Sequence, residues 1–347
     1  MIRKYILLAL LGSCLPAFGQ SALADFVLQG DALVAYTGEA RTVVISDALG
    51  IREIGDKAFA HSAVVSVTLP PGVEAIGDWA FWGCAELTDI SLPEGLVRIG
   101  DWAFLGCTSL QRLSVPDSLI SVGDWAFGNC SSLTAIETGE GNPAYAAVDG
   151  VLFDKSGTIL TIYPGGKPNS EYIIPEQVEL IRNLAFSGAV HLVTVRIPAG
   201  LRYIGNSAFY ECAGLAGIEV DPENPEYHSS NGVLFDKAGA TLLAYPGGSQ
   251  NPAYSIPYGV TVIGDRAFYG CAGFTSILIP ESVTNIGQEA FLGCVSLEAV
   301  ILGRSVADIG DRAFYGCAGL SQILLFRSSR LGEDAFGAVP GELVYLD

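Results

Sequence analysis

The dipeptide Ala-Phe recurs along this chain at a nearly constant interval, and this period restricts the possible folds more than any other feature. Its phenylalanine lies at positions 59, 81, 104, 127, 186, 209, 268, 291, 314 and 336. Most intervals are 22 or 23 residues, and the two exceptions are both 59, which is one 23-residue period plus 36 residues. A unit this short cannot bury its own apolar face, so units must stack and share a core. The period therefore predicts a right-handed solenoid of roughly a dozen coils around one continuous core.

The unit over residues 87–107 shows what each coil contains. Ile90 and Leu92 alternate with polar residues, which is typical of a short strand, and Pro93 ends the ladder. Gly100 and Asp101 then open a tight turn or short helix that places the Ala-Phe pair and a cysteine inward. We therefore expect a β-rich α/β fold, a leucine-rich-repeat solenoid with a parallel sheet on one face and short helical turns opposite.

Two similar inserts account for the long intervals, at about 139–172 and 221–254. Each contains Gly-Val-Leu-Phe-Asp, a turn ending in glycine and a second apolar run. This order of residues indicates a β-hairpin. We expect each insert to be a solenoid turn that carries a hairpin, within a single domain.

The composition excludes some partners. Half of the residues are apolar and 16% are charged, so the chain can bury a large core. The net charge is −19, which opposes binding to nucleic acids or to an anionic membrane surface, because such affinity comes from neutralising phosphates. Basic or cation-bridged partners fit this charge better.

The first 24 residues resemble an export signal. Arg3 and Lys4 precede a short apolar run, 5–11, which is too short to span a bilayer. Cleavage near 19 or 24 fits ordinary signal peptidase, whereas Leu11-Gly12-Ser13-Cys14 fits a lipobox with Cys14 as the lipidated residue. No later run is long enough for a transmembrane helix. The sequence predicts a secreted or cell-surface protein whose mature chain, 25–347, is one solenoid with caps at about 25–45 and 337–347.

The repeat unit Ile-Gly-Asp-x-Ala-Phe-x-x-Cys, the insert motif Asp-Gly-Val-Leu-Phe and the opening segment 25–38 together resemble the BspA-like bacterial leucine-rich repeat proteins. The resemblance covers about residues 25–347. It implies a leucine-rich-repeat fold and a secreted or surface-displayed protein, some relatives of which bind matrix proteins or other cells. The residues after the repeats are expected to form a capping strand and not the sorting or anchoring module of some larger members.

A ladder of phenylalanines and cysteines is expected inside the solenoid. It comprises Phe81, Phe104, Phe127, Phe209, Phe268, Phe291 and Phe314, with Cys84, Cys107, Cys130, Cys212, Cys271, Cys294 and Cys317 three residues after a repeat phenylalanine. Buried cysteine packs as a small apolar residue. The alternative is an occasional disulfide between neighbouring coils, since export places the chain in an oxidising compartment.

Trp79, Trp102 and Trp125 share one position, directly before Ala-Phe, in three consecutive units. The same position elsewhere holds Lys57, Ser207, Arg266, Glu289 and Arg312. Because this position accepts charge, we expect it to face solvent, with Trp82 nearby. The three indoles then either bind a sugar or a partner protein, or pack on one another and on the turn below.

The outward positions of the strands form a second candidate surface. They are polar near the N-terminus and become apolar at Leu278, Ile301 and Leu324. A contiguous exposed apolar patch can mark an interaction site. Simple β-propensity, or cover by a loop, explains the same residues equally well.

Catalysis and metal binding have little support in the sequence. The three histidines, His61, His191 and His228, occupy unrelated positions in the unit, and no catalytic, phosphate-binding or metal-ligand motif is present. The acidic segment 221–226 is interpreted as a solvated loop. The sequence therefore predicts a protein without cofactors that binds a protein or glycan and is not an enzyme. A structural envelope protein without a ligand site is the alternative.

Overall fold

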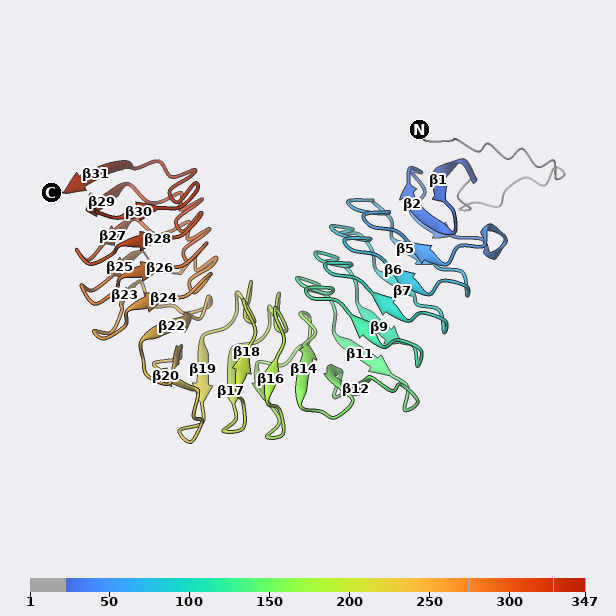
Figure 1. The fold of residues 1–347 in the computed structure, drawn as a ribbon, viewed down its shortest axis with the longest axis horizontal. Coiled ribbons are helices and arrows are strands. Elements are labelled where there is room, and N and C mark those ends of the chain that lie inside the picture. The colour runs from blue at the N-terminus through green and yellow to red at the C-terminus, as the bar shows by residue number, and fades with distance from the viewer. Residues whose placement is uncertain (1–22, 274, 327, 347) are drawn as a thin grey trace.

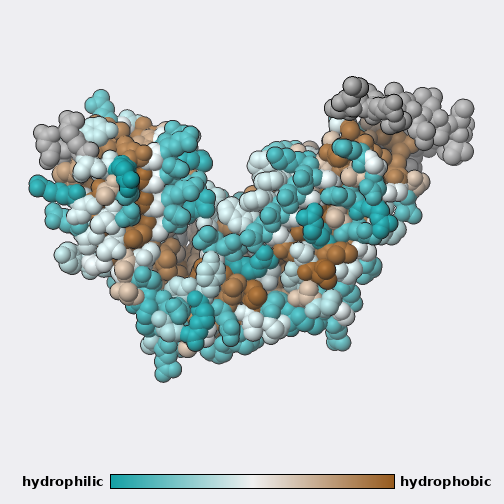
Figure 2. All heavy atoms as spheres, in the orientation of Figure 1, coloured by the Kyte–Doolittle hydropathy of each residue, from teal (hydrophilic) through white to brown (hydrophobic). Residues whose placement is uncertain are grey.

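The computed structural model describes residues 23–273, 275–326 and 328–346. The signal-peptide and lipobox assignments, including Cys14, lie outside these residues. The chain is a β-solenoid of stacked coils, bent so that two arms rise from a shorter middle section (Figure 1). In the space-filling view the molecule is hollowed between the arms (Figure 2).

Each regular coil carries two short strands. The outer strands are β3 (Thr42–Val44), β5 (Ser66–Thr68), β7 (Asp89–Ser91), β9 (Arg112–Val115), β11 (Ala135–Thr138), β15 (Glu171–Ile173), β17 (Thr194–Ile197), β19 (Gly217–Val220), β23 (Ala253–Ser255), β25 (Ser276–Leu278), β27 (Ala299–Ile301), β29 (Gln322–Phe326) and β31 (Glu342–Leu346). Those that pair do so in parallel, one coil apart, as in Ser66↔Asp89. Their buried residues, such as Ile90, alternate with exposed ones because successive side chains point to opposite faces.

A second row consists of two-residue strands, each of which ends directly before the Gly-Asp turn or its equivalent. They are β4 (Glu53–Ile54), β6 (Ala75–Ile76), β8 (Arg98–Ile99), β10 (Ser121–Val122), β16 (Leu180–Ile181), β18 (Tyr203–Ile204), β24 (Val262–Ile263), β26 (Asn285–Ile286), β28 (Asp308–Ile309) and β30 (Arg330–Leu331). They also pair in parallel, as in Ile76↔Ile99. Glycine follows most of them because a side chain there would collide with the preceding coil. A β-carbon on Gly100, for example, would lie 2.7 Å from the backbone of Gly77.

The predicted helical turns are wrong. The described residues contain no α-helix and only two short 3₁₀ helices, Leu23–Asp25 and Asp47–Leu49. In the Ala-Phe segments every second backbone amide donates to the next coil, as Phe81 does to the Ala103 carbonyl at 2.7 Å. The amides between them donate within the segment to the residue three before, as Trp82 does to the Trp79 carbonyl at 3.0 Å. An α-helix needs every amide for its own i→i−4 bonds, so stacking of the coils prevents a continuous helix on this face.

The expected single core and single parallel sheet are also wrong, because the solenoid consists of three stacks with separate cores. The first stack covers residues 26–138, the middle stack 151–220 and the third stack 233–346. Each stack starts in the same way, with a strand that is antiparallel to its neighbour and a tyrosine at the head of the aromatic ladder. These opening strands are β1 (Phe26–Gln29) with β2 (Ala32–Tyr36), β13 (Val151–Asp154) with β14 (Ile159–Ile162), and β21 (Val233–Asp236) with β22 (Thr241–Ala244).

The aromatic ladder follows the same division. It runs from Tyr36 to Phe127, from Tyr163 to Phe209 and from Tyr245 to Phe336. Neighbouring rings in each run are stacked with centroids 4.7–5.2 Å apart, which is the spacing of the coils.

A Val-Leu-Phe strand forms the wall between two cores. In β13, Leu152 belongs to the core of the first stack, whereas Val151 and Phe153 belong to that of the middle stack. All three are buried, because both faces of the strand meet a core. β12 (Tyr145–Val148) pairs antiparallel with β13, and β20 (Tyr227–Ser230) pairs in the same way with β21. We call these two boundaries the first joint and the second joint.

Candidate functional site

Each Ala-Phe coil has two positions with a left-handed backbone, four residues apart, and the tryptophans occupy the first one. Its φ lies between +49° and +63° at Lys57, Trp79, Trp102, Trp125, Leu184, Ser207, Arg266, Glu289, Arg312 and Asp334. This conformation is uncommon for residues other than glycine. Its recurrence shows that the stacking of the coils imposes it, whichever side chain is present. We call these residues the left-handed row.

The tryptophans are half-buried rather than fully facing solvent. The rings of Trp79 and Trp102 stack at 4.6 Å and 5°, and Trp125 meets Trp102 edge-on at 5.9 Å. The Lys57 ammonium lies 5.0 Å from the centre of the Trp79 ring. Trp82, in contrast, lies outside this group and packs on the His61 ring at 4.3 Å. The indoles thus contact one another, and each keeps an exposed part.

The left-handed row continues across the bend of the molecule. The Arg266 guanidinium lies 5.6 Å from the centre of the Trp125 ring, so the first stack contacts the third. Arg266 Nε pairs with Glu289 Oε2 at 2.7 Å, and Glu289 Oε1 also accepts from Arg312 at 3.3 Å. Because residues from the two arms meet here, the left-handed row lies on the inner side of the bend.

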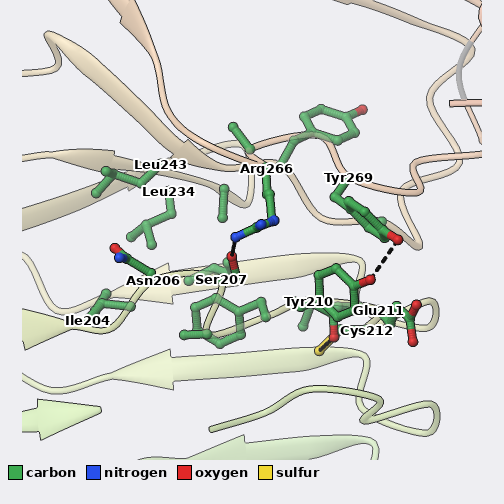
Figure 3. Close-up of a pocket in the computed structure, with 18 of the residues that line it drawn as sticks. Ile204, Asn206, Ser207, Tyr210, Glu211, Cys212, Leu234, Leu243, Arg266 and Tyr269 are labelled. Atoms are coloured by element: carbon green, nitrogen blue, oxygen red, sulfur yellow. Dashed lines mark hydrogen bonds between the residues drawn. The ribbon is translucent and has the colours of Figure 1, made fainter. Parts of the chain in front are cut away.

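A cavity of about 670 Å³ lies at the second joint, where the middle and third stacks meet. Figure 3 shows Arg266 and Tyr269 of the third stack opposite Ser207 and Tyr210 of the middle stack. Two side-chain hydrogen bonds cross the joint, from Arg266 Nη1 to Ser207 Oγ at 3.3 Å and between the Tyr210 and Tyr269 hydroxyls at 2.6 Å. The Gly248 amide also donates across it to the Leu215 carbonyl at 2.7 Å. Glu211 lines one end of the cavity, and burial raises its pKa.

The first joint is built from equivalent residues but is nearly closed, with a cavity of about 20 Å³. Arg182 crosses it, donating to the Val122 carbonyl at 2.8 Å and to Asp124 Oδ1 at 2.5 Å. The joints differ at the place of Arg182, which Gly264 holds at the second joint. The Arg182 side chain fills this place at the first joint, and no equivalent side chain fills it at the second.

The apolar outward row lies on the sheet of the third stack. Leu278, Ile301, Leu324 and Val344 are in register on β25, β27, β29 and β31. Leu278, Ile301 and Val344 are 45%, 57% and 37% exposed, and Leu324 is half-buried. Figure 2 also shows apolar residues gathered along this arm. The four side chains form the exposed aliphatic row of this sheet.

All seven cysteines among the described residues are buried and free. Each is placed to donate to the carbonyl of the ladder aromatic of the preceding coil, as Cys107 Sγ does to Phe81 at 3.3 Å. Burial raises the pKa of Cys84, Cys130 and Cys212 to about 12. These thiols are therefore protonated at neutral pH.

The segment at 221–226 differs from the expected solvated loop at one residue. Asn224 is fully buried, donates to the Pro198 and Leu201 carbonyls at 2.8 and 2.9 Å, and accepts from the Tyr227 amide. Asn142 makes the same bonds at the first joint. The Asn-Pro-x-Tyr motif is thus a structural part of each joint. No group of three or more potential metal ligands occurs within the described ranges.

Sequence reasoning did not identify the joint residues Arg182, Tyr210 and Tyr269. One signal was available: Arg182 replaces the glycine of the Ile-Gly-Asp/Asn turn in a single unit.

Over residues 23–346, apart from 274 and 327, no helix is long and apolar enough to cross a bilayer.

The sequence matches a known family over most of its length. The profile described as a BspA type Leucine rich repeat region matches six copies, over residues 36–147, 166–231 and 248–342. The gaps between these ranges fall on the strands that separate the three stacks.

Several solved bacterial proteins have a similar fold. A leucine rich cell surface protein from Faecalibacterium prausnitzii is 26% identical, with 90% of this chain and 83% of that chain covered and a TM-score of 0.52. A leucine-rich repeat protein from Eubacterium ventriosum is 21% identical, with 89% and 88% covered and a TM-score of 0.51. The pneumococcal vaccine antigen PcpA is 19% identical, with 92% and 78% covered and a TM-score of 0.50. No curated protein matches the chain.

Proposed function

The chain belongs to the BspA-type family of leucine-rich repeat proteins, and from this premise we propose that it is an exported, non-catalytic module that binds a protein partner at the cell surface. The similar protein from Faecalibacterium prausnitzii is described as a cell surface protein, which supports this location. The signal-like segment at 1–24 supports export, with cleavage near 19 or 24 and lipidation of Cys14 as the alternative.

The observation that carries the proposal is the exposed aliphatic row on the third stack. At the second outward position of the strand the first stack begins with Val44 and then holds Thr68, Ser91, Ser114 and Glu137, which are polar and exposed. The third stack instead holds Leu278, Ile301 and Leu324 at this position. Polar residues evidently suit the fold here, so strand formation does not require the aliphatic ones. Contiguous exposed apolar side chains are typical of a protein-binding surface.

The half-buried indoles of the left-handed row are the second candidate, and they suit a glycan. Sugars bind to exposed aromatic faces, but Trp79 and Trp102 already stack on each other. Their remaining exposed surface is smaller than the sequence suggested. This arrangement favours the exposed aliphatic row as the main binding surface.

The test is binding of residues 25–347 to an array of matrix proteins and glycans. One variant replaces Leu278, Ile301 and Leu324 with serine, and a second replaces Trp79, Trp102 and Trp125 with serine. Serine fits both places, since Ser91 and Ser207 occupy the equivalent positions. We expect a protein ligand whose binding is lost only in the first variant. Loss only in the second would assign the site to the indoles, and no ligand at all would favour a purely structural role.

A further inference from the structure

The two joints are equivalent, so the first can serve as a template for the second. The last two-residue strand before the first joint is β10, which ends at Val122, and the last before the second joint is β18, which ends at Ile204. The backbone of each of these residues faces the joint. The Val122 amide donates to the Tyr145 hydroxyl at 2.9 Å. The Ile204 amide donates to the Tyr227 hydroxyl at 3.0 Å. The open N–H of each strand end is therefore satisfied in the same way.

The backbone carbonyls of these two residues are treated differently. At the first joint the Val122 carbonyl accepts from Arg182 Nη1, and the same guanidinium pairs with Asp124. Asn183 Nδ2 also donates to Asp124 Oδ2 at 3.0 Å. The Arg182 side chain is 28% exposed, so most of it is buried between the two stacks.

At the second joint this guanidinium is absent. Gly264 stands in the place of Arg182, and within the described part of the chain no group donates to the Ile204 carbonyl. The carboxylate and the amide have exchanged sides, with Asn206 in the place of Asp124 and Asp265 in the place of Asn183. The second joint thus retains a carbonyl, an amide and a carboxylate that face an open cavity of about 670 Å³.

Arg266 does not fill this place. Its Nε is held by Glu289 and its Nη1 by Ser207, while its guanidinium lies over Trp125. In Figure 3, Ile204, Asn206, Leu234 and Leu243 lie to one side of the Arg266 guanidinium. Half-buried Leu243 provides apolar surface on that side of the cavity, against which methylene groups can pack.

We propose that the second joint binds a guanidinium group, which donates to the Ile204 carbonyl and the Asn206 side-chain oxygen, the equivalents of the Val122 and Asp124 acceptors of Arg182. Asp265, on the other side of the joint, supplies the negative charge that Asp124 supplies at the first joint. The net charge of −19 favours a cationic ligand. The guanidinium belongs either to a free arginine-like molecule or to an arginine side chain of a polypeptide. The site is separate from the exposed aliphatic row, so it does not depend on the proposed function.

The first test is calorimetric titration of residues 25–347 with N-acetyl-arginine methylamide. Its citrulline counterpart is the control, because it has nearly the same shape without the charge. For one group in an open site we expect a dissociation constant on the order of a millimolar, at least about tenfold weaker binding of citrulline, and weakening by added salt. Absent binding, or equal binding of the two compounds, would overturn the proposal.

Variants then locate the site. Gly264→Arg should supply the missing side chain and abolish binding of the arginine compound. A β-carbon fits better there than in most coils, since it meets the Leu242 carbonyl at 3.0 Å, whereas at Gly287 it would lie 2.5 Å from Asp265 Oδ1. Asp265→Asn is the milder variant, because it keeps the oxygen that accepts from the Gln288 amide and removes the charge. It should weaken binding about tenfold.

Asp101→Asn, at the equivalent position in the first stack, is the matched control and should leave binding unchanged. Binding that survives both Gly264→Arg and Asp265→Asn would place the ligand elsewhere and refute the assignment.

A short arginine-containing peptide distinguishes the two sources of the guanidinium, a free arginine-like molecule and an arginine side chain of a polypeptide. Binding at least about tenfold tighter than the free compound indicates a polypeptide ligand, because neighbouring residues then add contacts.

Discussion

At the scale of single residues, a ladder of carboxylates explains the Gly-Asp pair that opens each turn. Asp56 Oδ1 accepts from the Asp78 amide at 2.7 Å, Asp78 from the Asp101 amide at 2.9 Å, and Asp101 from the Asp124 amide at 2.7 Å. One side chain oxygen per coil thus satisfies an amide of the next coil. The bond needs the oxygen and not the negative charge, because in the middle stack the neutral Asn183 side chain accepts from the Asn206 amide in the same way.

Asp101→Ala should therefore lower the free energy of unfolding of the first stack by about 1–3 kcal/mol, because the part-buried Asp124 amide loses its acceptor. Asp101→Asn keeps an oxygen in place and relieves repulsion between neighbouring carboxylates, so its cost should be below about 0.5 kcal/mol. Urea denaturation followed by circular dichroism measures both. Equal losses in the two variants would show that charge, and not the acceptor, is what matters.

The buried thiols predict a pH dependence. Burial raises the pKa of Cys84, Cys130 and Cys212 from 9.0 to about 12, because a thiolate is poorly solvated in the core. Below pH 9 the thiols are protonated in both states. Between about pH 9 and 12 the unfolded chain loses these protons and the native chain keeps them, so stability falls as pH rises, by about 1 kcal/mol per thiol near pH 10.

Replacing these three cysteines with alanine, which Ala189 already provides in one coil, should flatten this alkaline fall in the urea midpoint between pH 8 and 10.5. The raised pKa values of the tyrosines leave a remaining slope, so the comparison is between the two slopes. An unchanged slope in the variant would contradict the assignment. A thiol reagent should also leave the native wild-type protein unlabelled at pH 8 and label it on unfolding.

At the scale of elements, the strand that separates two cores makes a specific prediction. Leu152 and Phe153 are neighbours in β13, but the first packs in the core of the first stack and the second in that of the middle stack. Each truncation to alanine should cost about 2–5 kcal/mol through lost burial and the cavity left behind. Hydrogen exchange should show faster opening mainly in residues 26–138 for Leu152→Ala and mainly in 151–220 for Phe153→Ala.

The sequence predicted the coil and the family, whereas contacts between coils determined the rest. Periodicity identified the strands around Ile90 and the inward phenylalanines, because these depend on a pattern repeated in every unit. The turn at Trp102 is left-handed and the Trp102 amide donates to the Asp124 carbonyl of the next coil, which no property of one unit reveals. Tryptophan also gives no local signal for a positive φ. The second joint escaped prediction because its cavity depends on Gly264, an ordinary turn glycine by sequence.

At the scale of the whole molecule, the division into three stacks means that the curvature is set at two joints. Strand ladders hold neighbouring coils within a stack, and the sheets end at each joint. The first joint is closed by Arg182, whereas the second has a large cavity that two side-chain hydrogen bonds cross. We therefore expect relative motion of the arms to occur mainly at the second joint, where Arg266 contacts three partners.

Arg266→Gln should loosen this arrangement, because it removes the ion pair with Glu289 and the contact over Trp125 that joins the first stack to the third. Spin labels on Thr68→Cys and Ala299→Cys, on exposed strand faces of the two arms, report the distance between them by pulsed electron paramagnetic resonance. The buried native thiols should remain unlabelled in the folded protein. We expect a broader distance distribution in Arg266→Gln than in the parent.

Arg304→Gln is the matched control, since Arg304 lies over Phe326 within the third stack and contributes nothing across the joint. It should leave the distance distribution unchanged. If Arg266→Gln leaves it unchanged as well, the hydroxyl pair of Tyr210 and Tyr269 is the stronger tie, and Tyr269→Phe should then broaden the distribution. Unchanged distributions in both variants would mean that the apolar contacts around β21 and the backbone bond from Gly248 to Leu215 fix the angle between the arms.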